Sequence, residues 1–231
     1  MMQLIFIHGS GGSKESWTYQ TQYFKDSIAL DLPGHPKGEL IPSIEGYVEW
    51  LRNFVQSAGY RRMVLVGHSL GGGIALLYAL KYPQDLAAII TVGSGARLRV
   101  HPMFLEGLEK VIKEPGAENP LATTAFEKID PELASVLKRR SAENGPAAAL
   151  NDLKACDQFD IMDRLPQITV PALALCGDQD IMTPPKYSQY LVAHMPQARA
   201  LVIPGGTHMV FAEKPREVNR AIEDFLQTLG E

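Results

Sequence analysis

The stretch Met63-Val64-Leu65-Val66-Gly67-His68-Ser69-Leu70-Gly71-Gly72 decides the fold of this chain. Its first four apolar residues predict a buried strand, and the mostly apolar run 70–82, which Pro83 ends, predicts a helix. Between the two, residues 67–71 match the pattern G-x-S-x-G. A serine in such a strand-turn-helix lies at a sharp turn, beside the free N–H groups of a helix N-terminus. We therefore expect Ser69 to be a nucleophile.

Five further apolar runs flank this unit along the chain. They are continuous rather than alternating, which is typical of strands buried on both faces of a parallel sheet. Helical patterns separate them, so the alternation predicts a doubly wound α/β sheet with helices on both faces. The expected strands are 3–8, 27–32, 63–67, 87–93, 171–177 and 200–203, and the expected helices are 44–58, 70–82, 184–194 and 215–229.

The alternation stops between residues 97 and 166, where no strand-like run occurs. A helical insertion between two parallel strands predicts a cap over the carboxyl ends of the strands, where open α/β sheets bind ligands. We expect 1–96 and 167–231 to form the core and 97–166 to form the cap. Short helices are expected at about 101–113, 121–128, 131–140 and 146–156, with Pro131 and Pro146 at two of the starts.

A serine hydroxyl needs a general base, and the base needs an orienting acid. The G-x-S-x-G pattern predicts the order Ser, then Asp or Glu, then His. Asp180 follows the apolar run that ends at Cys176, and His208 follows the next expected strand. Both lie in loops at the carboxyl ends of strands, so they can meet Ser69 at one edge of the sheet. Asp178 is the alternative acid, although we favour Asp180.

An oxyanion intermediate needs two N–H donors. One is the backbone N–H of Leu70, the residue after the nucleophile, and the other comes from the loop after the first strand. That loop, called the hole loop below, is the glycine-rich stretch 8–13. In it we expect the Ser10 N–H to be the donor, with Gly11 as the alternative. The loop has no G-x-G-x-x-G pattern and no Walker lysine follows, which disfavours phosphate binding.

The composition is that of one globular domain with an insertion: 231 residues, 45% hydrophobic and 21% charged. A net charge of −4 argues against a nucleic-acid partner. There is no apolar run long enough for a membrane span and no basic region of a signal peptide, so we expect a cytoplasmic protein. Neither the histidines nor Cys156 and Cys176 show metal-ligand spacing, so no metal and no other cofactor is expected. The oligomeric state stays open.

Taken together, these motifs resemble the α/β-hydrolase superfamily. The matching pieces occur in the family's order, namely HGSGGSKESW at 8–17, DLPGH at 31–35, GHSLGG at 67–72, GDQD at 177–180 and PGGTH at 204–208. The resemblance implies a catalytic triad of Ser69, Asp180 and His208. It also implies an oxyanion hole formed by the backbone N–H groups of Ser10 and Leu70. The chain looks most like small bacterial carboxylesterases with a helical cap. The family normally has two strands before the strand that leads into this loop, and here that strand begins at residue 3, which predicts a shortened, mostly parallel sheet of about six strands.

The triad and the resemblance predict a serine hydrolase that cleaves small or medium carboxylic esters through an acyl-enzyme intermediate. Its partner is then a small-molecule acyl ester. Two alternatives remain open: the same triad acting on a thioester or a C–C bond, and a slow-turnover ligand-binding protein on this fold. Four apolar residues in the insertion either line an acyl pocket or form the cap's own core, namely Met103, Phe104, Leu105 and Leu108.

Overall fold

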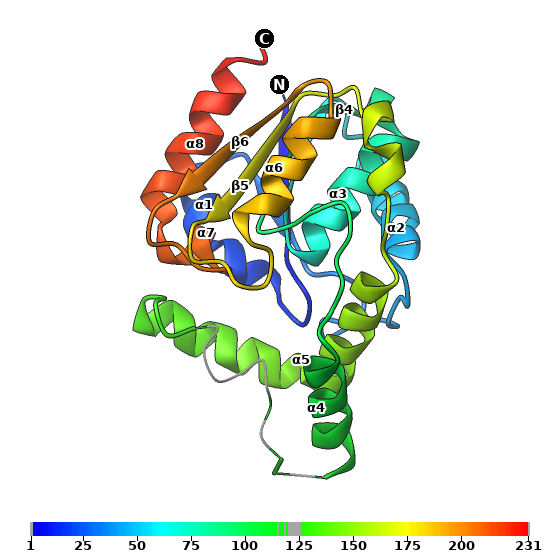
Figure 1. The fold of residues 1–231 in the computed structure, drawn as a ribbon, viewed down its shortest axis with the longest axis vertical. Coiled ribbons are helices and arrows are strands. Elements are labelled where there is room, and N and C mark those ends of the chain that lie inside the picture. Colours follow the sequence, from blue (N-terminus) through cyan, green and yellow to red (C-terminus); the bar gives the residue numbers. More distant parts are fainter. Residues whose placement is uncertain (1, 115, 118, 120–125, 231) are drawn as a thin grey trace.

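The computed structural model describes residues 2–114, 116–117, 119 and 126–230, and it contains a six-stranded sheet (Figure 1). The strands are β1 (Gln3–Ile7), β2 (Ile28–Leu30), β3 (Met63–His68), β4 (Leu86–Val92), β5 (Ala172–Gly177) and β6 (Ala198–Ile203). Their order across the sheet is β2-β1-β3-β4-β5-β6, and every neighbouring pair is parallel. The expected α/β fold with a shortened sheet of about six strands is confirmed.

Helices cover both faces of this sheet, as expected. On one face α2 (Ile44–Ser57), α3 (Leu70–Lys81) and α6 (Pro185–His194) share an apolar cluster with Ile5 and Leu65 of the strands. On the other face the 3-10 helix η1 (Lys14–Trp17), α1 (Thr18–Tyr23), α7 (Val210–Glu213) and α8 (Pro215–Gln227) pack with Phe6 and Val64. Successive strand side chains point to opposite faces, so two buried faces require continuous apolar runs.

The central helix α3 is apolar on every side because it is enclosed on every side. Its residues from Leu70 to Ala79 are all buried, and the 3-10 helix η2 (Pro83–Asp85) follows its end. Two glycines at the start of α3 let it pack closely against the strands, since Gly71 lies against Ile7 of β1 and Gly72 lies near Gly67 of β3. None of the helices within the described ranges is long and apolar enough to cross a membrane.

The insertion at 97–166 contains α4 (Pro102–Lys113), α5 (Pro131–Asp157) and the 3-10 helix η3 (Met162–Gln167). Figure 1 shows α4 and α5 beyond the carboxyl ends of the strands. An isolated antiparallel bridge between Arg97 and Asp160 joins the two ends of the insertion. The insertion holds no strand in its described part. Its status as a separate cap domain stays a prediction.

Helix α5 combines two of the expected helices, 131–140 and 146–156. Gly145 interrupts it with φ 76° and ψ 165°, directly before Pro146. Proline favours the first turn of a helix, so the second half of α5 starts at Pro146, as the sequence predicted. The expected helix at 121–128 lies largely outside the described residues, and 126–128 form a turn.

Candidate active site

Ser69 occupies a strained turn between β3 and α3. Its backbone has φ 49° and ψ −112°, a combination that residues other than glycine rarely adopt. The neighbouring glycines make the turn possible: an added Cβ at Gly67 would lie 2.0 Å from the Gly71 carbonyl oxygen, and one at Gly71 would lie 2.4 Å from the Ile7 carbonyl oxygen. The Ser69 N–H donates to the Val92 carbonyl at 3.0 Å, which anchors the turn to β4.

Two backbone N–H groups near Ser69 are candidates for binding an oxyanion. Leu70 is the first residue of α3, so its N–H has no partner within the helix. The loop after β1 lies against the same turn, since an added Cβ at Gly9 would be 3.3 Å from the Ser69 Cβ. Ser10 follows Gly9, and its hydroxyl lies 3.7 Å from the Cys156 sulfur of α5.

The alternative donor, Gly11, has another partner. Its N–H donates to the Asp152 carboxylate at 2.9 Å. The Asn144 side chain donates to the carbonyl oxygens of Gly11 and Gly12, at 3.1 and 2.6 Å. With the Gly11 N–H engaged, Ser10 remains the stronger candidate for the second donor.

Asp180 and His208 form a close pair at the carboxyl ends of β5 and β6. The His208 Nδ1–H donates to the Asp180 Oδ2 at 2.9 Å, and the Thr183 hydroxyl donates to the same oxygen at 2.8 Å. The N–H groups of Met182 and Thr183 donate to Oδ1, both at 2.9 Å. Burial acts to raise the pKa of Asp180, but the hydrogen bonds from His208 and Thr183 outweigh it and lower the pKa to about 2.

The turn after β4 lies between Ser69 and this pair. The Ser94 hydroxyl donates to the Ser69 carbonyl at 2.7 Å. Gly93 has φ 54°, and an added Cβ there would lie 3.2 Å from both Asp180 Oδ2 and His208 Nδ1. Within the described residues no hydrogen bond joins the Ser69 hydroxyl to His208. Such bonds are often long in unliganded hydrolases and tighten when substrate binds.

His68 supports the His208 loop from behind the turn. Its Nε2–H donates to the His208 carbonyl at 3.0 Å, and its ring lies 4.7 Å from the rings of both His208 and Phe211. Burial lowers the pKa of His68 well below its ordinary value, and the neighbouring His208 adds to the effect. His68 is therefore a neutral structural neighbour of Ser69.

Asp178 has a different environment from Asp180. It is exposed, and its Oδ1 accepts the Gly205 N–H at 2.7 Å. This bond holds the loop that leads from β6 to His208. Asp180, rather than Asp178, is thus the carboxylate that contacts the histidine.

Sequence reasoning missed several groups that support the site. Thr183 lies three residues after Asp180, a spacing at which a hydroxyl can bond a carboxylate in a turn, so a local signal exists. Asp152 and Asn144 contact the hole loop from more than 130 residues away. In the sequence, these two residues cannot be distinguished from polar residues on the exposed face of a helix, so no pattern identified them.

Most of the apolar residues in α4 pack within the insertion. Leu108 is fully buried against Ala149 and Leu153 of α5, and Phe104 and Leu105 pack on this cluster. Met103 is 56% exposed. The sequence left open whether these four residues line an acyl pocket or form the insertion's own core. In the structure, Phe104, Leu105 and Leu108 belong to that core and Met103 does not.

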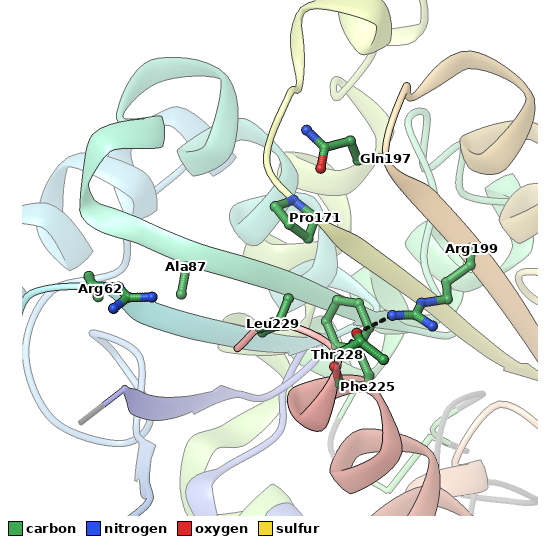
Figure 2. Close-up of a pocket in the computed structure, with 8 residues that line it drawn as sticks. All are labelled: Arg62, Ala87, Pro171, Gln197, Arg199, Phe225, Thr228 and Leu229. Carbon is green, nitrogen blue, oxygen red and sulfur yellow. Dashed lines mark hydrogen bonds between the residues drawn. The ribbon is translucent and has the colours of Figure 1, made fainter. Parts of the chain in front are cut away.

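Two cavities are lined by residues other than Ser69, Asp180 and His208. One of about 310 Å³ opens at the opposite edge of the sheet, at the amino ends of β3 to β6 (Figure 2). It is lined by Arg62, Ala87, Pro171, Gln197, Arg199, Phe225, Thr228 and Leu229. The other, of about 530 Å³, lies beside the loop 31–38 after β2 and reaches Trp50 and Arg140. In the described part of the chain, no three His, Cys, Asp or Glu side chains are arranged to hold a metal ion.

Comparison with known proteins places the chain among hydrolases. It is 27% identical to (E)-2-((N-methylformamido)methylene)succinate hydrolase of Acinetobacter baylyi, over 97% of this chain and 90% of that protein. The structure of a thermophilic esterase has 32% identity and a TM-score of 0.82, and the match covers 98% of this chain and 90% of that one. A lipase-esterase related protein from Clostridium acetobutylicum has 26% identity and a TM-score of 0.81, over 96% and 93% of the chains.

The match extends over nearly the whole chain. A model of the alpha/beta hydrolase fold matches residues 3–215, a range that includes the sheet, the Ser69 turn and the Asp180–His208 pair. This chain therefore belongs to the alpha/beta hydrolase fold family.

Proposed function

We propose that this protein is a serine hydrolase that cleaves small or medium carboxylic esters through an acyl-enzyme intermediate. Ser69 is the nucleophile, His208 the general base and Asp180 the acid that orients it. The observation that carries the proposal is the strained Ser69 turn at the start of α3, beside the Asp180–His208 pair, in which the carboxylate is buried. The 32% identity to an esterase of the same fold supports an ester substrate.

Acylation follows from the positions of these groups. The Ser69 oxygen attacks the ester carbonyl carbon, and the proton of its hydroxyl passes to His208 Nε2, the nitrogen that faces away from Asp180. The oxygen of the resulting tetrahedral intermediate accepts the N–H groups of Ser10 and Leu70. Collapse of the intermediate breaks the bond to the alcohol, which leaves with the proton from His208. Asp180 stabilises the imidazolium that forms in between.

Deacylation repeats these steps with water. His208 takes a proton from a water molecule as its oxygen attacks the acyl carbon of the ester on Ser69. The second tetrahedral intermediate collapses, the bond to the Ser69 oxygen breaks, and that oxygen regains a proton from His208. The carboxylic acid is released and the free enzyme returns. A thioester could pass through the same steps with a thiol as the leaving group.

Turnover of p-nitrophenyl acetate, butyrate and octanoate tests the proposal. The wild-type protein is expected to show a burst of about one nitrophenolate per chain before steady turnover, since an acyl-enzyme accumulates. Ser69→Ala is expected to lose activity by about 10⁴- to 10⁶-fold. Ser27→Ala is the matched control, because its hydroxyl bonds the Phe24 carbonyl near the outer strand β2. Substantial turnover by Ser69→Ala would refute the proposal.

The same preparation separates the alternatives. A stoichiometric burst without steady turnover would identify a slow-turnover ligand-binding protein. Rates with an acetyl thioester and with a vinylogous diketone, compared with the matched acetate ester, rank thioester and C–C bond hydrolysis against ester hydrolysis. We expect the ester to have the highest kcat/KM.

A further inference from the structure

Asp152 is a fully buried carboxylate in the second half of α5, outside the proposed triad. Its Oδ2 accepts the Gly11 N–H and faces His35 Nε2, both at 2.9 Å. Its Oδ1 accepts the Tyr47 hydroxyl at 2.7 Å. The carboxylate thus joins the inserted helix to the hole loop, to the loop after β2 and to α2.

The charge of Asp152 is balanced by His35. The Nδ1 of His35 faces the Pro33 carbonyl at 3.1 Å, and its Nε2 faces the carboxylate. A carbonyl and a carboxylate both accept hydrogen bonds, so this position suits a ring with a proton on each nitrogen. Burial acts to lower the pKa of His35, but the hydrogen bond and charge of Asp152 outweigh it and raise the pKa. Without such a partner the buried carboxylate would be an uncompensated charge, which is costly in a protein interior.

The neighbouring His8 is neutral and has one defined tautomer. Its Nε2 accepts the Leu32 N–H at 3.1 Å, so its proton is on Nδ1, which donates to the Gly9 carbonyl at 2.8 Å. Burial and the nearby His35 lower the pKa of His8 to about 4. The Gly9 carbonyl also accepts the Gly12 N–H at 3.0 Å.

Three consecutive peptide groups of the hole loop are therefore held in place. The Gly9–Ser10 peptide is held through its oxygen by His8, the Ser10–Gly11 peptide through its N–H by Asp152, and the Gly11–Gly12 peptide through its oxygen by Asn144. A trans peptide is planar, so holding the Gly9 oxygen on one side directs the Ser10 N–H to the other. Two of the three contacts come from α5.

We propose, on the basis of the function proposed above, that Asp152 is a positioning residue: it holds the Ser10–Gly11 peptide and so keeps the Ser10 N–H, whose direction His8 sets through the Gly9 oxygen, in place beside Ser69. The inserted helix then contributes to the rate of the chemical step and not only to the shape of the substrate site. A glycine-rich loop without this contact can rotate its peptide groups at little cost, since Gly11, at φ 63°, has no side chain to restrict it.

Asp152→Leu tests the proposal because leucine has nearly the shape of aspartate but no accepting oxygen, so the Gly11 N–H loses its partner. Removal of one hole donor costs about 10²- to 10³-fold in kcat, so misdirecting a donor is expected to cost about 10- to 100-fold. KM is expected to change by less than about threefold, since the ground-state ester does not need the hole.

Tyr78→Phe is the matched control for a loss of stability. It removes a buried hydroxyl that donates to Asp85 at 2.9 Å, at the other end of α3 from Ser69. Both variants are expected to lower Tm, and only Asp152→Leu is expected to lower kcat. A folded Asp152→Leu with kcat within threefold of wild type would overturn the proposal, as would an equal loss of kcat in Tyr78→Phe.

Amide exchange gives a readout that is independent of activity. With ¹⁵N-glycine labelling, the Gly11 amide is expected to exchange at least tenfold faster in Asp152→Leu than in wild type, and as slowly in Tyr78→Phe as in wild type. Unchanged Gly11 exchange in Asp152→Leu would refute the positioning role. If Ser69→Ala proved fully active, the proposed function would fail, and the Gly11 exchange rates would still decide whether Asp152 holds the loop.

Discussion

Two aspartates two residues apart have different tasks at the end of β5. The chain turns after Gly177, so Asp180 points to His208 while Asp178 accepts the Gly205 N–H. In an extended strand both side chains would point the same way. The sequence alone therefore distinguished them only through the possibility of a turn and through the family resemblance.

Asp180→Asn is expected to lower kcat by about 10⁴-fold at neutral pH, because the amide no longer holds the correct tautomer of His208 or stabilises its cation. Asp178→Asn is the matched control. Its remaining side-chain oxygen can still accept the Gly205 N–H, so kcat is expected to stay within about threefold of wild type. Steady-state rates with p-nitrophenyl acetate check both variants, and the reverse order of effects would assign the acid to Asp178.

At the scale of helices and strands, the features that the sequence predicts are those that depend on the pattern of neighbouring residues. Continuous apolar runs predict the buried strands well, and Gly145-Pro146 predicts the break in α5. The outer strand β6 begins at Ala198, two residues before the expected start, because an edge strand is only partly buried and its first residues need not be apolar. The packing of α4 on α5 depends on the three-dimensional path of the insertion, and so the sequence left the role of Leu108 open.

Leu108→Ala is expected to lower the free energy of unfolding by about 2–5 kcal/mol, since it creates a cavity between α4 and α5. Met103→Ala, on the same helix but 56% exposed, is the control and is expected to change it by less than about 0.5 kcal/mol. Urea unfolding followed by circular dichroism measures both. Equal effects of the two variants would show that Leu108 does not belong to a packed core.

At the scale of the whole molecule, the site depends on contacts between distant parts of the chain. The candidates Ser69, Asp180 and His208 could be selected from the sequence because each follows a strand in the order that the motif predicts. The contact between Gly11 and Asp152 joins residues 141 positions apart, and neither residue type is unusual for its element. Long-range polar contacts of this kind follow from the packed structure alone.

Buried neutral histidines make the stability of the molecule depend on pH. The pKa of His8 is about 4 in the folded protein and 6.5 is its ordinary value, so the unfolded chain binds the proton more tightly. The stabilising contribution is complete above pH 6.5 and is lost as the pH falls toward 4, an effect of about 3 kcal/mol. His68 acts in the same direction.

His8→Gln is therefore expected to flatten the decline in the free energy of unfolding between pH 6.5 and 4, although it lowers stability at pH 7. His194→Gln, at an exposed histidine, is expected to leave the wild-type slope unchanged. Urea unfolding at several pH values gives these slopes. An identical slope in wild type and His8→Gln would contradict a neutral, buried His8.

The most direct test of the central claim is covalent labelling of the nucleophile. An alkyl fluorophosphonate forms a phosphorus–oxygen bond with an activated serine and releases fluoride. Mass spectrometry of the intact protein and of its peptides is expected to show one label per chain, on Ser69, with esterase activity lost in proportion and no label in Ser69→Ala. A label on another residue, or full esterase activity in the fully labelled protein, would contradict the assignment of Ser69 as the nucleophile.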